Sequence, residues 1–268
     1  MTVAVLADIH GNIVALEAVL QDLEQQGGVD HIVVAGDLFT FGPAPNQVLT
    51  RLRRVSNIHF LLGNTDRYLL EGTYPSASTN DDWQDKLLVS FHWTAERLED
   101  EGLHFLRTLP AFQIIPDAGW QLLAVHGSPR SDEEGLTSKT QPHEFEDMSI
   151  PRYINVLACG HTHIPMNRTV GTLRVVNAGS VGLPFDGDPR ACYAIISGST
   201  ASGDSPVQVQ LRRIVYDVEK VVEQFYACNH PAADIGAYNL RTARSIGSDL
   251  IYTPEMRLRN SSFVVSEE

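Results

Sequence analysis

Five apolar runs in this sequence each lead directly into residues that can bind a metal ion. The runs occupy residues 3–7, 31–36, 58–63, 122–125 and 156–160. Because open sheets with helices on both faces carry their reactive groups at the carboxyl ends of the strands, side chains that follow these runs are expected to meet. The ligand-type residues that follow them are Asp8, His10, Asp37, Asn64, His126, His161 and His163. We expect one polar cluster, large enough to hold two metal ions.

Two pairs within this set are separated by one residue, Asp8 with His10 and His161 with His163. In extended backbone, residues i and i+2 point to the same side, so one ion can contact both members of a pair. Carboxylate and imidazole ligands suit a borderline divalent ion; manganese is the preferred candidate, with iron, zinc or nickel as alternatives. Asp37 follows Gly36, which lets the backbone turn sharply. We therefore choose Asp37 as the carboxylate that bridges two ions.

Each of these residues has an ordinary structural explanation when taken alone. An aspartate after a strand often caps a helix, Asn64 can be a turn residue, and His126 can be a core histidine. These explanations would have to hold independently at five strand ends, where buried polar groups without partners would cost several kcal/mol. The joint pattern therefore favours a two-metal site.

The overall charge argues against a nucleic-acid polymer as the partner. The 268 residues include 20 Lys and Arg against 33 Asp and Glu, which gives a formal net charge of −13. Proteins that bind nucleic acid non-specifically, nucleases included, need basic stripes that neutralise phosphates. A nucleic-acid polymer is therefore not expected as a partner.

Composition also indicates the compartment. The three cysteines, Cys159, Cys192 and Cys228, have neither disulfide-framework nor zinc-site spacing. No basic leader precedes the first apolar run, and no apolar stretch approaches the roughly 20 residues that span a bilayer. We expect a cytoplasmic protein that does not associate with membranes.

The first part of the chain alternates strands and helices. Strands are predicted at 2–7, 31–35 and 58–62, with helices at 12–25 and about 45–54 between them. This order is typical of a parallel sheet with crossover helices. The segment 68–110 is then interpreted as a helical cap inserted beside the site, with a surface loop at 74–82 and a helix at about 83–98.

The remainder of the chain is mostly β-structure followed by helix. Strands are predicted at 111–115, 120–125, 155–159, 164–169, 172–176, 190–197 and 207–215. A helix at 217–228 begins a helical region that extends to 246, and residues 253–268 read as a polar tail. We expect a single domain over 1–268, of mixed α/β class, with two mixed sheets packed together and helices outside.

The polar blocks also resemble a known family. The blocks are DIHGN (8–12), GD (36–37), GN (63–64), HG (126–127) and GHTH (160–163). In order and spacing they resemble the five blocks of the calcineurin-like metallophosphoesterases. The further runs GPAP (42–45), HGSP (126–129), NAGSVG (177–182) and DGDPRACYAI (186–195) resemble a branch of small bacterial and archaeal phosphodiesterases and phosphatases.

The resemblance implies a four-layer α/β/β/α sandwich, a ligand assignment and an activity. One ion would be held by Asp8, His10, Asp37 and His163, and the other by Asp37, Asn64, His126 and His161. Such a pair, about 3.5–4 Å apart, can lower the pKa of a bridging water and so provide a hydroxide for in-line attack on phosphorus. The activity that the resemblance implies is hydrolysis of phosphodiester, phosphomonoester or nucleotide anhydride bonds in a small phosphorylated substrate, such as a nucleotide. Hydrolysis of dinucleoside polyphosphates is one specific alternative.

A non-catalytic scaffold on the same fold is the main alternative to an enzyme. Some relatives of this fold serve as trafficking scaffolds with degraded metal sites. Here all seven ligand positions carry competent side chains, which favours a hydrolase.

At two positions the sequence differs from the protein Ser/Thr phosphatases, and both differences narrow the range of expected substrates. Their Asp-Arg-Gly run, whose arginine grips phosphate, is replaced by Thr40, Phe41 and Gly42. The histidine that protonates their leaving group is replaced by Thr65, whose hydroxyl is a poor general acid near neutral pH. A protein-phosphatase role is therefore not expected, and leaving groups that need little protonation are favoured.

Substrate contacts must then come from other residues. Arg67, Arg130 and Arg190 each lie close to a motif and can bind phosphate in bidentate fashion, although solvated surface positions are an equal alternative. Asn64 is a further candidate for substrate binding. His10 is a candidate proton relay as well as a ligand.

Overall fold

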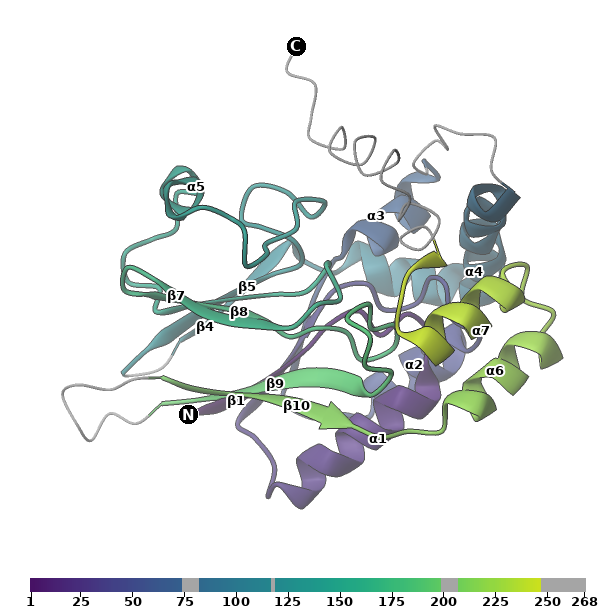
Figure 1. The fold of residues 1–268 in the computed structure, drawn as a ribbon, viewed down its shortest axis with the longest axis horizontal. Helices are drawn as coiled ribbons and strands as arrows, with labels where there is room; N and C mark the ends of the chain where they lie inside the picture. Colours follow the sequence, from purple (N-terminus) through teal and green to yellow (C-terminus); the bar gives the residue numbers. More distant parts are fainter. Residues whose placement is uncertain (74–81, 117–118, 199–206, 247–268) are drawn as a thin grey trace, which may run out of the picture.

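Two five-stranded sheets lie face to face and helices cover their outer faces (Figure 1). The computed structural model describes residues 1–73, 82–116, 119–198 and 207–246. The first sheet has the order β10-β9-β1-β2-β3. Its strands are β1 (Thr2–Leu6), β2 (His31–Ala35), β3 (Ile58–Leu61), β9 (Ala191–Ser197) and β10 (Gln208–Ile214). The second sheet has the order β4-β5-β6-β8-β7. Its strands are β4 (Phe112–Pro116), β5 (Gln121–Val125), β6 (Val156–Cys159), β7 (Met166–Val170) and β8 (Leu173–Asn177).

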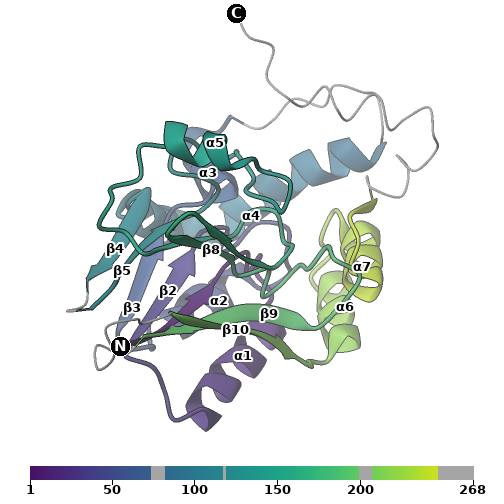
Figure 2. The same cartoon turned by 60° about the vertical axis from the view of Figure 1, so that its left-hand side comes forward.

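Both sheets are mixed. In the first, β1, β2 and β3 are parallel, whereas β9 runs antiparallel to β1 and β10 antiparallel to β9. In the second, β5, β6 and β8 are parallel, and β4 and β7 are antiparallel edge strands. Figure 2 shows β2 and β3 of the first sheet side by side, with β4, β5 and β8 of the second sheet above them in the view. The predicted fold class is confirmed.

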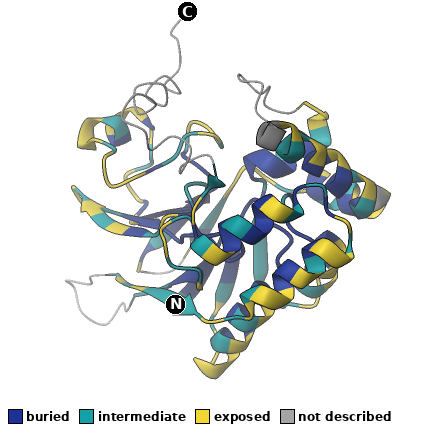
Figure 3. Cartoon of the chain, turned by 45° about the vertical axis from the view of Figure 1, so that its right-hand side comes forward, coloured by how far each residue is buried: buried dark blue, intermediate teal, exposed yellow. Residues whose placement is uncertain are grey.

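Unbroken apolar runs form these strands because both faces of each sheet are buried. Successive side chains of a strand point to opposite faces. In β1, Val3 and Val5 pack between the two sheets, and Ala4 and Leu6 pack under the helices. A third cluster lies between the outer face of the second sheet and α5. Figure 3 shows helices that are buried on the side facing the sheets and exposed on the other.

The helices account for the other layers. They are α1 (Ile13–Gln25), α2 (Pro45–Leu52), α3 (Asn64–Glu71), α4 (Asp82–Arg107), α5 (Pro142–Asp147), α6 (Val218–Ala227) and α7 (Ala233–Thr242). Asn12 caps α1 by accepting a hydrogen bond from the Ala15 amide, and Asp217 caps α6 through the Lys220 amide. Among the described residues, no helix is long and apolar enough to cross a lipid bilayer. The three cysteines form no disulfide.

The segment 68–110 differs from its prediction in two respects. Residues 68–71 complete a helix, α3, that was not predicted; it begins at Asn64, where Asp66 accepts a hydrogen bond from the Gly63 amide. Residues 74–81 of the predicted loop lie outside the described residues. The predicted helix at 83–98 continues to Arg107, and Phe91, Leu98 and Leu106 join the main core beside α1. Much of this segment is thus part of the central fold. A short helix, α5, lies between β5 and β6. The tail at 253–268 lies outside the described residues.

A buried histidine joins α4 to the C-terminal helices. The His230 ring lies 4.4 Å from the Trp93 ring of α4 and 4.9 Å from the Phe225 ring of α6, measured between centroids. Its Nδ1 accepts a hydrogen bond from the Ala232 amide at the start of α7. Its Nε2 has no hydrogen-bond partner in the described part of the chain. Burial, assisted by the charge of Arg97, lowers the pKa of His230 to about 4.

This histidine should make stability depend on pH. Its folded-state pKa lies below the unfolded value of about 6.5, so between these values the unfolded chain binds a proton that the folded chain does not. The free energy of unfolding therefore falls as pH falls through this window. The variant His230→Asn keeps an acceptor for the Ala232 amide. Between pH 7 and pH 5 we expect its free energy of unfolding to fall by about 2 kcal/mol less than that of the wild type.

Urea unfolding at the two pH values measures this difference. The exposed His143 on α5 supplies the control, because His143→Asn should keep the wild-type dependence. Equal pH dependence in His230→Asn and the wild type would contradict the assignment.

Candidate metal centre

The predicted ligands lie together above the carboxyl ends of strands from both sheets. The first group is Asp8, His10, Asp37 and His163, whose nitrogen and oxygen ligand atoms lie within 4.8 Å of one another. His10 Nε2 is 3.1 Å from His163 Nε2 and 3.7 Å from Asp37 Oδ2. His163 Nε2 is 3.5 Å from Asp8 Oδ1. All four side chains are buried.

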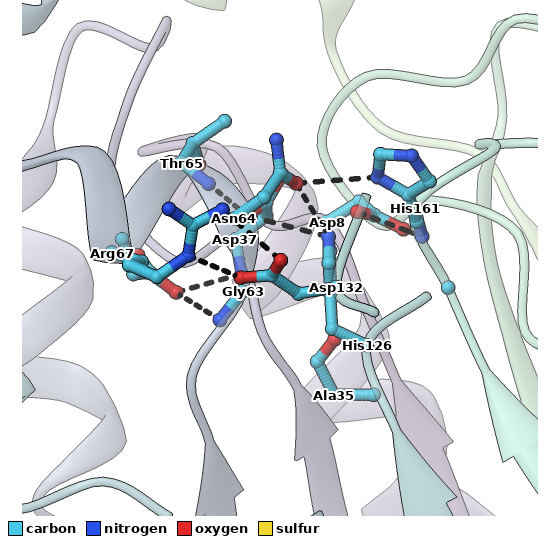
Figure 4. A network of polar contacts seen from close by, with 12 residues as sticks. Asp8, Ala35, Asp37, Gly63, Asn64, Thr65, Arg67, His126, Asp132 and His161 are labelled. Carbon is cyan, nitrogen blue, oxygen red and sulfur yellow. Dashed lines mark hydrogen bonds and ion pairs between the residues drawn. The ribbon is translucent and has the colours of Figure 1, made fainter. Parts of the chain in front are cut away.

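The second group adjoins the first through Asp37. His126 Nε2 lies 3.5 Å from Asp37 Oδ1 and 2.9 Å from Asn64 Oδ1. His161 Nδ1 lies 3.2 Å from the same amide oxygen. Figure 4 shows Asn64 between the two histidine rings, and the His161 amide directed at Asp8. The structure therefore brings all seven predicted residues into one connected cluster.

Backbone carbonyls determine which ring nitrogens face this cluster. The Nδ1 atoms of His10 and His126 lie 2.8 Å from the carbonyls of Thr40 and Ala35, respectively. His163 Nδ1 makes the same contact with the Leu183 carbonyl. Because a carbonyl only accepts hydrogen bonds, Nδ1 of each neutral ring carries the proton and Nε2 presents its lone pair to the cluster. This is the tautomer in which Nε2 binds metals.

Two nitrogen lone pairs that face each other show whether the residues fit a metal ion. The Nε2 atoms of His10 and His163 are 3.1 Å apart, and neither carries a proton in this tautomer. Burial lowers the pKa of each ring, so protonation does not readily relieve the repulsion. A cation between the two nitrogens does relieve it. Imidazole nitrogens together with carboxylate oxygens suit a borderline divalent ion, and the residues therefore fit the predicted group.

The two carboxylates lead to the same conclusion. Burial raises the pKa of Asp8, and the charge of Asp37 raises it further. Burial also acts to raise the pKa of Asp37; what lowers it is mainly positive charge on the neighbouring histidines, led by His126 and His10, and the neutral rings described above do not carry that charge. Two buried carboxylates this close repel each other when both are ionised. Divalent cations would remove that penalty.

The backbone at the cluster departs from the prediction. Extended backbone was expected to align the i, i+2 pairs, but β1 ends at Leu6, before the first pair. Within the cluster, left-handed φ angles between 46° and 67° occur at Asp8, His10, Asp37, His161 and His163. Such values are uncommon outside glycine and mark strained turns at functional sites. The side chains meet because tight turns direct them inward, so the reason given from the sequence was wrong.

Asp66 is a buried residue that the sequence reasoning missed. Its carboxylate accepts hydrogen bonds from the amides of Asp37, Leu38 and Gly63, at 2.8–3.1 Å. It therefore holds together the two turns that carry Asp37 and Asn64. Burial raises the pKa of Asp66, and the three amides act to lower it. An acidic residue in the first turn of a helix is a recognisable signal, but α3 itself had not been predicted.

Other polar side chains support the remaining turns. Ser180 donates a hydrogen bond to the Asp8 carbonyl, at 2.7 Å. Asn177 donates to the Gly160 carbonyl, also at 2.7 Å, just before His161. The run NAGSVG thus holds the backbone of two ligand-bearing turns.

The three arginines proposed for substrate binding are paired with carboxylates. Arg67 contacts Asp132 at 2.7 Å, as Figure 4 shows, and also contacts Glu71 and Glu133. Arg130 pairs with Glu134, and Arg190 pairs with Asp188 at 2.6 Å. None of the three lines the cavity beside the cluster. A phosphate would have to displace these carboxylates to reach the arginines.

A cavity of about 230 Å³ opens onto the cluster. The cluster residues that line it are His10, Asp37, Asn64, His161 and His163. Thr65 lines it as well; its amide donates to Asp37, and its buried hydroxyl has no hydrogen-bond partner in the described residues. The remaining lining comes from α4, α7 and nearby loops. The C-terminal helical region therefore contributes to the site, which the sequence reasoning had not predicted.

Comparison with known proteins identifies the family. A model of the calcineurin-like phosphoesterase superfamily domain matches residues 1–201, and the chain belongs to this superfamily. It is 28% identical to phosphodiesterase YfcE of Escherichia coli over 207 residues, 73% of this chain and 87% of that protein. It is 31% identical to a symmetrical bis(5'-nucleosyl)-tetraphosphatase of Pectobacterium carotovorum over 154 residues, 53% of each chain. A metallophosphoesterase structure from Sphaerobacter thermophilus superposes with a TM-score of 0.69 at 25% identity, covering 91% of this chain and all of that one. The predicted family and hydrolase class are confirmed.

The role of Asp66 can be tested by removing its carboxylate. Asp66→Ala would leave three buried amide donors without their acceptor, at roughly 1–3 kcal/mol each. We expect the free energy of unfolding to fall by at least about 3 kcal/mol. We also expect weaker manganese binding, measured by calorimetry, because the turns that carry Asp37 and Asn64 are released.

Glu71, on the same helix, provides the matched control. Its carboxylate is half exposed and pairs with Arg67 at the surface, so Glu71→Ala should change stability by less than about 1 kcal/mol. An Asp66→Ala protein as stable as the Glu71→Ala protein would show that Asp66 has no such role.

Proposed function

We propose that the chain binds two divalent metal ions and hydrolyses phosphoesters. The observation that carries this proposal is the 3.1 Å approach of the Nε2 atoms of His10 and His163 in a buried cluster of carboxylates, with the Nδ1 atom of each ring against a backbone carbonyl. The four residues of each group are proposed as the ligands of one ion. Manganese is the preferred ion because the ligands combine nitrogen and oxygen atoms.

Asp37 is proposed to bridge the two ions. Its Oδ2 faces His10 of the first group and its Oδ1 faces His126 of the second, at 3.7 and 3.5 Å. The Thr65 amide donates to Oδ1 and Asp66 holds the Asp37 backbone, so the carboxylate has a defined orientation. When bound, such an ion pair supplies a nucleophile at neutral pH and stabilises the charge that develops on phosphate.

His10 is proposed as a ligand rather than as the proton relay considered from the sequence. Its Nδ1 is committed to the Thr40 carbonyl, and its Nε2 faces the ligand atoms of Asp37 and His163. Both ring nitrogens are therefore already engaged, one with the backbone and one with the cluster.

Phosphodiesters and phosphomonoesters with weakly basic leaving groups are the proposed substrates. Thr65 stands where the protein phosphatases have a histidine acid, and its hydroxyl holds its proton too tightly to replace it. The similarity to a phosphodiesterase over most of the chain favours a phosphodiester. A non-catalytic scaffold is disfavoured because all seven ligand positions are occupied by competent side chains.

Metal analysis together with a hydrolysis assay tests this function. We expect the purified protein to carry about two transition-metal ions and, with manganese added, to hydrolyse bis(4-nitrophenyl) phosphate. A protein that binds no metal and hydrolyses no phosphoester in manganese would refute the proposal.

Substituting a side chain that is proposed to bind metal should abolish activity without unfolding the protein. We expect Asp37→Ala and His161→Ala to lower kcat by at least about 100-fold and to reduce the bound metal, while circular dichroism remains that of the wild type. His143→Ala removes an exposed histidine and should change neither quantity. Full activity in either ligand variant would exclude that residue from the site.

A further inference from the structure

We propose that this site selects phosphoesters with one phosphate group and an apolar or aromatic substituent, and that it discriminates against polyphosphates. This inference rests on the proposed phosphoesterase function and specifies its substrate class. Two features of the cavity carry it: the apolar character of its walls and the charge of its lining.

The cavity has a polar floor and apolar walls. The floor is the ligand cluster. The walls are mainly apolar and are formed by Phe41, Leu87, Leu183, Phe185, Ile235 and Ile246, with Asn239 and Ser245 as polar members. A substrate that binds within this cavity, with its phosphate on the floor, places its ester substituent against these side chains. An apolar or aromatic group gains from this contact because it leaves water.

The walls are held in place by packing. Phe185 stacks on His163 with ring centroids 4.4 Å apart and an interplanar angle of 10°. Phe41 packs edge-on against Phe91 of α4, at 5.1 Å. Leu183 belongs to the apolar cluster between α6 and α7, against which Phe41 and Phe185 also pack. The apolar surface thus exists before a substrate binds.

The α7 side of the wall has a further constraint. The Asn239 Oδ1 accepts a hydrogen bond from the Ile246 amide, at 3.0 Å, so the segment after α7 is held against the cavity. Figures 1 and 2 both show α7 beside α4, the helix that supplies Leu87. The substituent would lie between these two helices.

The charge of the lining is the second feature. Among the described residues that line the cavity, none is lysine or arginine. The nearby Arg67 and Arg130 are neutralised by Asp132 and Glu134. Two metal ions can balance one phosphate group, but the additional phosphates of a polyphosphate would lie against apolar walls without a partner. Burying unpaired charge is strongly unfavourable, so polyphosphates should bind poorly.

A substrate series with one leaving group tests the inference. We would measure kcat/KM for release of 4-nitrophenol, in manganese, from three esters. They are 4-nitrophenyl phenyl phosphate, 4-nitrophenyl methyl phosphate and the γ-(4-nitrophenyl) ester of ATP, in which the second substituent is adenosine 5'-diphosphate. The expected order is phenyl, then methyl, then the diphosphate, with phenyl at least about 10-fold above methyl. Diadenosine tetraphosphate should be hydrolysed more slowly than the phenyl diester.

A cation placed on the wall should change this preference. Leu87 is half-buried and lines the cavity, whereas Val89, on the same helix, is 48% exposed and does not line it. Leu87→Lys should lower kcat/KM for the phenyl diester and raise it for diadenosine tetraphosphate. Val89→Lys adds the same charge outside the cavity and should leave both values unchanged.

The outcomes separate this inference from the proposed function. Equal or faster hydrolysis of the diphosphate ester or of the tetraphosphate by the wild type overturns the inference and leaves the phosphoesterase function standing. An unchanged preference in Leu87→Lys also overturns it, because the wall would then have no part in selection. Hydrolysis of none of the substrates, with manganese present, refutes the phosphoesterase function itself.

Discussion

The central constraint in this molecule is a buried volume into which hydrogen-bond acceptors converge without enough donors. The Nε2 atoms of His10 and His163 face each other, and the carboxylates of Asp8 and Asp37 lie beside them. Carbonyl groups hold the ring protons on the opposite side of each imidazole. In this arrangement the folded chain carries electrostatic repulsion that cations relieve. Metal binding and the stability of the folded cluster are therefore linked.

Each level of the fold contributes to maintaining this arrangement. Strands of two separate sheets end at the cluster, so residues far apart in the sequence are brought within a few ångströms. Turns with left-handed backbone then direct the side chains inward. Asp66, Asn177 and Ser180 hold those turns through backbone groups rather than through the ligands themselves. The repulsion at the centre is thereby balanced by many hydrogen bonds around it.

The parts of this account that could be predicted from sequence are those with a local signal. Apolar runs predict the strands because both faces of the sheets are buried, and the polar residues after them predict the cluster. The left-handed turns have no such signal, since Asp8 and His10 would have the same spacing in a strand. α3 has Asp66 in its first turn, and the contact of Asp66 with the Asp37 amide crosses from one strand end to another. Pairing of Arg67 with Asp132 likewise depends on contacts between distant segments.

The C-terminal wall of the cavity illustrates the same limit. In the sequence, residues such as Ile235 have the spacing of an ordinary apolar helix face. Only their position above the cluster gives them a role in substrate selection. Anomalous diffraction from manganese-soaked crystals most directly tests whether the acceptor cluster is a two-metal centre. We expect two peaks about 3.5–4 Å apart, one on each side of Asp37. No peak at the cluster, or manganese bound only elsewhere on the molecule, would contradict the account.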